Sequence, residues 1–235
     1  MATLLSAIET QARRHLLEET AAFWTSAELI AIINKGIKDL WRDVVDLKEE
    51  HFLTVDATNV SMAASTGTLT GVPAGVHKVY VIEPRVLTSS GSNPGLYFER
   101  REYHHPDFQN ARGQSAVDPT NSVIFYAVTG AGAPVAAPTV YVAPQVTSAV
   151  NLTFAYVPVL ADLSSSGDVP IPGEADSALI AWTVAFARAK ERDDRSPDPN
   201  WLAIYATEKA HLLQSLGLRD YSKETVIDAF FSQYW

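Results

Sequence analysis

The chain has 235 residues, 47% hydrophobic and 19% charged, which is enough for one large domain or two small ones with a sizeable core. The net charge of −9 argues against phosphate-backbone binding, and the lack of cysteine excludes disulfides, thiol catalysis and Cys-ligated metals. No apolar run reaches the roughly 18 residues of a membrane span. The N-terminus carries Glu9 and no apolar segment of the signal-peptide kind, so we expect a soluble protein made in the cytoplasm, without a membrane partner.

Two amphipathic helices are predicted near the N-terminus. Apolar residues recur at steps of three and four over 3–17 and again in "FWTSAELIAIINKGIKDLWRDVV". Thr25 is a good N-cap for the second helix, and Glu28, three residues later, completes a capping box. Gly36 costs this helix about 1 kcal/mol relative to Ala, which suggests that another helix approaches closely there. The apolar stripe consists of Leu29, Ile33, Ile37, Leu40, Trp41 and Val44.

From residue 51 the chain changes to short runs rich in Val, Tyr, Phe and Thr, separated by Gly, Pro, Asn and Ser. Runs such as "GVHKVYVIEPR" and "VNLTFAYVPVLAD" predict an antiparallel β region of roughly six strands, folded as a small twisted sheet or sandwich. "YHHPDFQNARG" interrupts this region, and we expect one short helical turn starting near Pro106.

Helical periodicity returns in "DVPIPGEADSALIAWTVAFARAKERDD", after prolines that end the last strand segment. "RSPDPN" predicts a turn, and either Asn200 or Asp198 caps the next helix. That helix is predicted to end at Gly217, a residue suited to the C′ position. The inward-facing residues of these two helices include Leu179, Trp182, Phe186, Trp201 and Tyr205.

The predicted fold class is α+β, in which N- and C-terminal helices form one bundle and an antiparallel β lobe is inserted between them. The predicted domains are the bundle over 1–50 and 171–217, the β lobe over 51–170, and an extended C-terminal docking arm over 218–235. The bundle core is expected to contain Trp24, Leu29, Ile33, Ile37, Leu40, Trp41, Leu179, Trp182, Phe186, Trp201 and Tyr205.

No motif in the sequence indicates catalysis, a metal or a cofactor, and we expect a protein that is not an enzyme. His104 and His105, with Asp107, are the strongest metal candidates, but adjacent strand residues point to opposite faces and do not easily share an ion. The acidic stretch "DDRSPDPN" lacks the central Gly of a calcium loop. "GAGAP" lacks the Lys and helix of a phosphate loop, and no Gly-x-Ser-x-Gly elbow is present.

The C-terminal end is unusually apolar, because Phe230, Phe231, Tyr234 and Trp235 fall within the last six residues. Burying one such side chain yields roughly 2–3 kcal/mol. The tail either folds back on the protein's own core or forms an arm that docks in a partner's groove. The polar stretch "LRDYSKET" and the position of the aromatic residues at the free end favour the arm.

The segment "FWTSAELIAIINKGIKDLWRDVV" resembles the second helix of tailed-phage head–tail adaptor (neck connector) proteins, where an aromatic residue precedes a Ser/Thr-capped helix with an Asn in its middle. "HFLTV", "GVHKVYVIE", "VYVAP" and "VPIPGEADSALIAWTVAFARAKERDD" resemble later segments of that family in the same order. Together they cover most of residues 20–215. The chain departs in a longer, Ser/Gly-rich β block and in Val72-Pro73, where the family has Leu-Pro.

The resemblance implies a structural virion protein in the neck between capsid portal and tail, made in the host cytoplasm. Such adaptors form a homo-oligomeric ring, usually twelve-fold, with the helical bundle packed against the portal protein. DNA passes through the ring without specific binding. The β lobe faces the tail or nozzle (tail-terminator) protein, and the C-terminal arm reaches the portal. The aromatic residues at 230–235 would then be the portal-docking arm.

Two other functions are compatible with the sequence. The β lobe could bind carbohydrate or a host receptor on a virion, which predicts a groove lined by the aromatic residues Tyr97, Phe98, Tyr103 and Phe108. A small hydrolase would instead need paired carboxylates at a fixed separation, for which Glu99 and Glu102 are the close pair in the β block.

Overall fold

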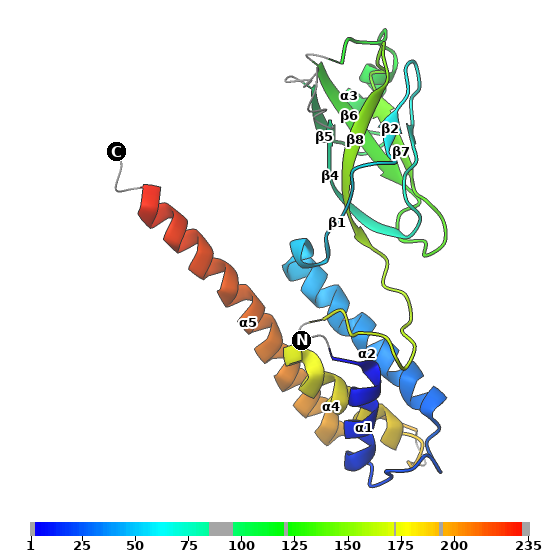
Figure 1. The fold of residues 1–235 in the computed structure, drawn as a ribbon, viewed down its shortest axis with the longest axis vertical. Coiled ribbons are helices and arrows are strands. Elements are labelled where there is room, and N and C mark those ends of the chain that lie inside the picture. Colours follow the sequence, from blue (N-terminus) through cyan, green and yellow to red (C-terminus); the bar gives the residue numbers. More distant parts are fainter. Residues whose placement is uncertain (1–2, 85–95, 120–121, 172, 193–194, 232–235) are drawn as a thin grey trace. The chain divides into compact units, whose positions relative to one another are not determined.

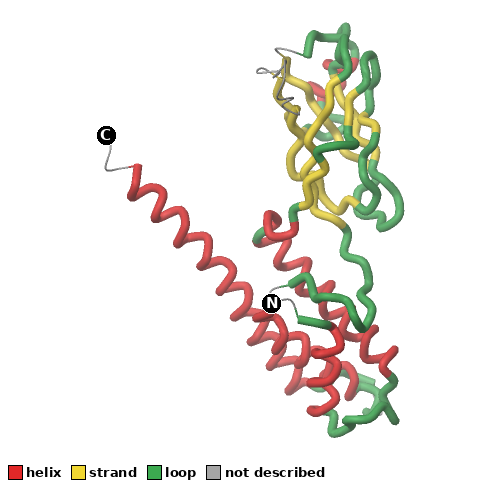
Figure 2. Tube along the Cα trace, in the orientation of Figure 1, coloured by secondary structure: helices red, strands yellow, loops and turns green. Residues whose placement is uncertain are grey.

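The computed structural model describes residues 3–84, 96–119, 122–171, 173–192 and 195–231, drawn in Figure 1. The chain divides into two units, Met1–Glu49 with Ala161–Trp235, and Glu50–Leu160. The first is built of helices and the second mainly of strands (Figure 2). Both ends of the chain contribute to the helical unit, so the β unit is an insertion. This confirms the predicted α+β class.

The helical unit contains four α-helices in the described part of the chain. α2 and α4 each contact all three of the other helices, and the contacts of α4 are the more extensive. Buried side chains lie on more than one face of α4, including Ala178, Leu179, Thr183 and Val184, as expected of a helix surrounded by neighbours. The helices are α1 (Leu5–His15), α2 (Ser26–Leu47), α4 (Asp176–Arg188), which follows the 3-10 turn η2 (Gly173–Ala175), and α5 (Pro199–Phe231).

α2 begins at a capping box and meets α4 at a glycine. The Thr25 side chain accepts the Glu28 N–H at 3.3 Å, and the Glu28 carboxylate accepts the Thr25 N–H at 2.9 Å. A Cβ placed on Gly36 would lie 2.6 Å from Cδ1 of Trp182, closer than real Cβ atoms come to a neighbour. The close helix approach predicted at Gly36 is therefore confirmed.

The β unit consists of two sheets. In the five-stranded sheet, β8 pairs with β1 and β2 along one edge and with β4 along the other, and β3 pairs with β2. Its strands are β1 (Thr54–Asp56), which follows η1 (Glu49–Phe52), β2 (Ser61–Met62), β3 (Leu69–Thr70), β4 (Val76–Pro84) and β8 (Val150–Pro158). The three-stranded sheet has the order β5 (Leu96–Arg100), β6 (Ser122–Thr129), β7 (Thr139–Ala143).

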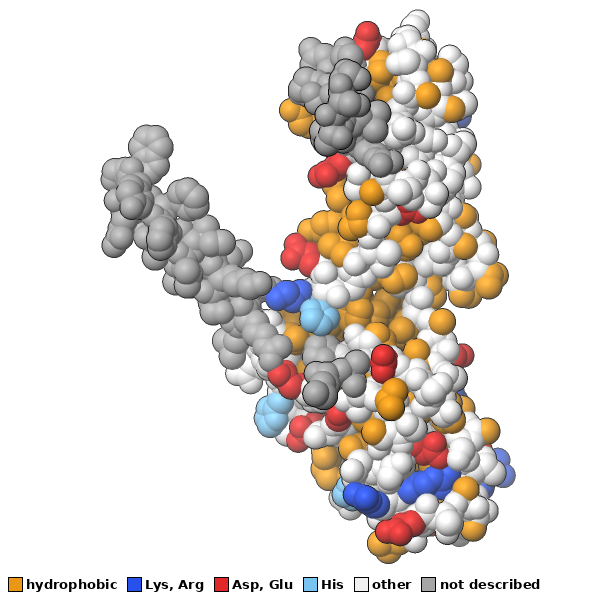
Figure 3. Space-filling model, viewed as in Figure 1, with side chains coloured by type: hydrophobic (Ala, Val, Ile, Leu, Met, Phe, Trp, Pro, Cys, Tyr) orange, Lys and Arg blue, Asp and Glu red, His pale blue; other side chains and the backbone are white. Residues whose placement is uncertain are grey.

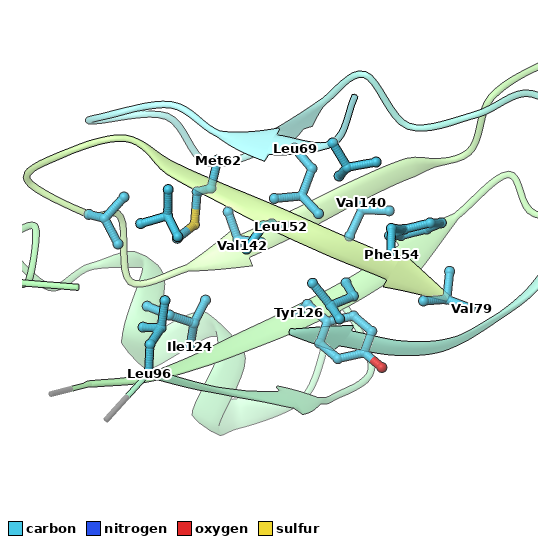
Figure 4. Close-up of a cluster of buried hydrophobic side chains, with 14 of the residues drawn as sticks. Met62, Leu69, Val79, Leu96, Ile124, Tyr126, Val140, Val142, Leu152 and Phe154 are labelled. Carbon is cyan, nitrogen blue, oxygen red and sulfur yellow. The ribbon is translucent and has the colours of Figure 1, made fainter. Parts of the chain in front are cut away.

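One core joins the two sheets (Figure 4). Leu152 and Phe154 of β8 contribute from the larger sheet, and Ile124 and Val140 from the smaller one; all four are fully buried. Most of their neighbours on these strands are more exposed, as the period-two alternation of strands predicts, but Ala155 is buried. Phe125 and Tyr141 pack with Phe108 of α3 (Pro106–Arg112) in a second cluster on the other face of the smaller sheet. The result is a small sandwich, as the spacing of the short apolar runs predicts.

The prediction of an antiparallel lobe is wrong at one strand pair. β5 and β6 are parallel, with Leu96 opposite Ser122 and Arg100 opposite Tyr126. Parallel neighbours need a crossover connection, and here it contains α3 (Pro106–Arg112), the helical turn predicted to start near Pro106. The interruption in the strand pattern is thus the crossover itself.

The predicted end of the last helix at Gly217 is also wrong. α5 continues through this residue to Phe231. A C′ glycine has a positive φ, and among the described residues the glycines with positive φ are Gly71, Gly75, Gly130 and Gly132. The segment 218–231 is therefore helical rather than an extended arm. Tyr234 and Trp235 lie outside the described residues.

Candidate functional site

An aromatic cluster holds the first half of α5 against α4. The Trp182 ring lies 4.2 Å from the Phe186 ring and 5.0 Å from the Tyr205 ring, measured between centroids. The Trp182 indole N–H donates to the Ile32 carbonyl on α2 at 3.1 Å, which fixes the ring in place. α5 is therefore joined to both α4 and α2 through one indole.

Charged groups connect α5 to α2 directly. The Lys209 ammonium lies 2.8 Å from the Asp39 carboxylate and also contacts Asp43, while the Tyr205 hydroxyl donates to Asp39. Partial burial would raise the pKa of Asp39, but hydrogen bonds from Lys209 and Tyr205 outweigh it and the pKa is lowered. Burial, followed by the Asp39 contact, raises the pKa of Tyr205, so the hydroxyl stays protonated and remains a donor.

The start of α5 is attached to α4 and α1. Asp198, one of the two predicted caps, accepts the Asn200 N–H at 3.0 Å and pairs with Arg188 at 3.4 Å. The Trp201 ring lies 5.1 Å from the His15 ring of α1. The Arg188 guanidinium stands 5.8 Å from the centre of the Trp201 ring. The first half of α5 is thus fixed along its length to three other helices.

Asn34 has a role that sequence reasoning did not assign. Its amide nitrogen donates to the Leu163 carbonyl at 3.0 Å, and its amide oxygen accepts the Leu163 N–H at 2.9 Å. Lys38, one turn later, pairs with Asp162 at 2.6 Å. These contacts attach the segment that leads into α4 to the middle of α2. The sequence does show an amide beside the apolar stripe of α2, which could have indicated a buried hydrogen bond. Its partner, however, lies 129 residues away, so the sequence could not identify it.

Glu28 also stabilises the other end of the bundle. Its carboxylate pairs with Lys190, just beyond α4, at 3.0 Å. The backbone hydrogen bond at Thr25, then the hydrogen bond from Lys190, lower the pKa of Glu28 to about 2. The same carboxylate therefore caps α2 and joins it to the end of α4.

We expect the contribution of ionised Glu28 to the free energy of unfolding to depend on pH. Because the folded-state pKa is depressed from 4.5 to about 2, this contribution is complete above pH 4.5 and is lost as the pH falls toward 2. Urea unfolding of the natural protein and of Glu28→Gln should show a stability difference that shrinks over this range. A difference that stays constant down to pH 2 would contradict the assignment.

The residues predicted for the bundle core all lie in the helical unit. Three of them are partly exposed: Trp182, Phe186 and Trp201. The others are buried: Trp24, Leu29, Ile33, Ile37, Leu40, Trp41, Leu179 and Tyr205. Phe230 and Phe231 form the last helical positions of α5.

The four aromatic residues predicted to line a receptor-binding groove differ in their exposure. Phe108, a residue of α3, is fully buried, and Tyr103 packs against it and against Tyr141, with ring centroids 5.7 and 4.8 Å apart. Phe98 packs against the sandwich core. Tyr97 alone of the four is strongly exposed, at 66%.

The polar groups of the β unit are bonded to one another. Glu99 pairs with Arg101 at 2.6 Å. Arg101 also stands 5.4 Å from the centre of the Phe125 ring. His105 accepts the Asp107 N–H at 3.2 Å and so caps α3. Figure 3 shows few Lys or Arg side chains on the visible face of this unit.

Neither a metal site nor a membrane span is found among the described residues. No group of three or more His, Asp or Glu side chains is arranged to hold a metal ion in this part of the chain. Within the same residues, no helix combines the length and apolarity that crossing a bilayer requires.

Comparison with known families agrees with the features described above. The family model of the SU10 adaptor protein matches residues 2–226, which includes the helical unit, the β unit and most of α5. No curated protein shows a significant match. Since the family match extends over nearly the whole chain, the protein belongs to the SU10 adaptor protein family, consistent with the phage head–tail adaptors that its helices resemble.

Proposed function

We propose that the protein is a head-to-tail adaptor that docks under the portal as a ring, and that α5 carries the docking arm. The observation that supports this most directly is the construction of α5. Its first half is fixed to α1, α2 and α4, whereas the helix continues to Phe231 and ends in aromatic residues. A helix rises about 1.5 Å per residue, so the segment after Gly217 carries Phe230 and Phe231 about 20 Å from the anchored half.

The remaining parts of the proposal follow from the two units. The helical unit packs side by side with copies of itself, in a ring that we expect to be twelve-fold, and against the portal protein. The β unit offers a platform for the tail or nozzle protein. The net charge of −9 suits a channel through which DNA moves without adhering. The role is structural, in the neck of the virion, and needs neither catalysis nor a cofactor.

Deletion of residues 226–235 tests the docking arm. We expect the truncated protein to fold normally by circular dichroism, because the described contacts that anchor α5 come before Gly217. It should fail to join purified portal rings in gradient sedimentation and electron microscopy.

A matched substitution separates side-chain chemistry from helix length. Phe230→Ala with Phe231→Ala keeps the full chain and should weaken portal binding at least tenfold, since burial of each ring yields roughly 2–3 kcal/mol. Asp228→Ala, in the same turn, serves as the control and should bind normally. Normal portal binding by both the truncated protein and the double variant would refute the docking role of the arm.

A further inference from the structure

We propose that Gly217 is a joint at which α5 either continues or ends, so that the segment 218–231 takes two directions relative to the anchored half of the helix. Figure 1 shows α5 as one continuous helix, which runs from Pro199 through Gly217 to Phe231. The proposal adds to this state a second one, in which the helix stops at Gly217.

Gly36 and Gly217, which lie inside the described α-helices α2 and α5, differ in what surrounds them. Packing explains the glycine at position 36, because a Cβ there would lie 2.6 Å from the Trp182 ring. Around Gly217, in contrast, a Cβ would find nothing within 4 Å. Glycine costs a helix interior about 1 kcal/mol relative to Ala, and no close contact explains that cost at Gly217. What glycine does provide is ready access to the left-handed backbone conformation that ends a helix.

The residues around Gly217 also fit a helix end. A Schellman motif with Gly217 at C′ places residue 218 at C″ and residue 213 at C3, and these two positions often make an apolar contact. Both are leucines in this sequence. Leu213 is partly exposed and lines a groove between α2 and α5 with Asp43, Asp46, Leu47 and Lys209. That groove would receive Leu218 in the stopped state.

We place the second-state helix end at Gly217 because the two halves of α5 differ on either side of this residue. Leu212 and Leu216 are 2% exposed, and Ser215 donates to Glu174 at 3.0 Å, so the helix is tied down up to this point. The segment beyond has about 14 residues, near the length below which an unsupported helix is marginal in water. It includes the β-branched run 225–227, which lowers helix propensity further.

The joint is proposed for the protein alone, without a bound portal. That it turns the arm toward the portal rests on the function proposed above. In that use, the anchored half stays on the bundle while the arm changes direction, so docking would not require the bundle to rearrange.

Spin labels measure the joint directly, because the chain has no native cysteine. Lys35→Cys on α2 with Asp228→Cys reports the direction of the arm, and Lys35→Cys with Gln214→Cys serves as the control on the anchored half. Double electron–electron resonance should give one narrow distance for the control pair and two populations or a broad distribution for the arm pair. Gly217→Ala should collapse the arm distribution to the distance of the continuous helix.

An arm distribution that is already as narrow with the native glycine as it is in the Gly217→Ala variant would overturn the joint. This outcome is distinguishable from failure of the docking function. A narrow distribution, together with loss of portal binding after truncation, removes the joint and leaves the docking arm. Two populations, together with normal portal binding after truncation, establish the joint and remove the docking role.

Discussion

Arg13→Met should lower the free energy of unfolding by about 3–5 kcal/mol, the typical cost of removing one partner of a buried ion pair. Arg13 and Glu9 are 6% and 9% exposed, and their charged groups lie 2.9 Å apart. The guanidinium also donates to the Trp24 carbonyl at 3.1 Å and to the Ser26 hydroxyl at 3.2 Å. Met fills much of the volume but leaves the Glu9 carboxylate buried without its partner.

The neighbouring arginine provides the control for this experiment. Arg14 is exposed, so Arg14→Met should change stability by no more than about 0.5 kcal/mol. Replacing both partners, Glu9→Leu with Arg13→Met, should recover most of the loss, since the unpaired charge is then gone. Urea unfolding followed by circular dichroism measures all three. Equal midpoints for Arg13→Met and Arg14→Met would show that the buried pair does not hold α1 to the start of α2.

Gly36→Ala should destabilise the protein by about 1–3 kcal/mol, although Ala is the better helix former. The new methyl group would lie 2.6 Å from Cδ1 of Trp182. The indole has little room to move, because it donates to the Ile32 carbonyl and stacks within 4.2 Å of Phe186. Relief of the clash therefore requires α2 and α4 to separate.

Gly217→Ala is the matched control, because it makes the same chemical change in open space. It should be neutral or should stabilise the helix by up to about 1 kcal/mol. Thermal unfolding of the two variants should shift in opposite directions or differ clearly in size. If the Gly36→Ala variant is as stable as the natural protein, α2 and α4 can accommodate a methyl group at this contact and the prediction is wrong.

Sequence reasoning succeeded where structure depends on neighbouring residues. The start of α2 at Thr25 and the start of α3 at Pro106 follow from interactions within one helical turn, which a local pattern contains in full. The close approach at Gly36 could also be predicted, because a glycine inside a helix calls for an explanation. Trp182, Phe186 and Tyr205, each predicted to face inward, lie in one aromatic cluster.

The failures have non-local causes. Whether β5 pairs parallel or antiparallel with β6 depends on how the chain crosses over between them, and the strand residues themselves do not record this. The partner of Asn34 lies 129 residues away. At Gly217 the local signal for a helix end is real, but it competes with the continuation of the helix, and the sequence alone does not decide between them.

The pairing of β1 with β8 has a consequence for how such proteins can diversify. Thr54 lies opposite Tyr156, so the strands by which the chain enters and leaves the β unit are direct neighbours. Antiparallel partners are about 5 Å apart at their Cα atoms, so the two ends of the insertion nearly coincide. We therefore expect that a different lobe, or a short hairpin, with equally close ends can replace the β unit at these two points while the helical unit keeps its fold.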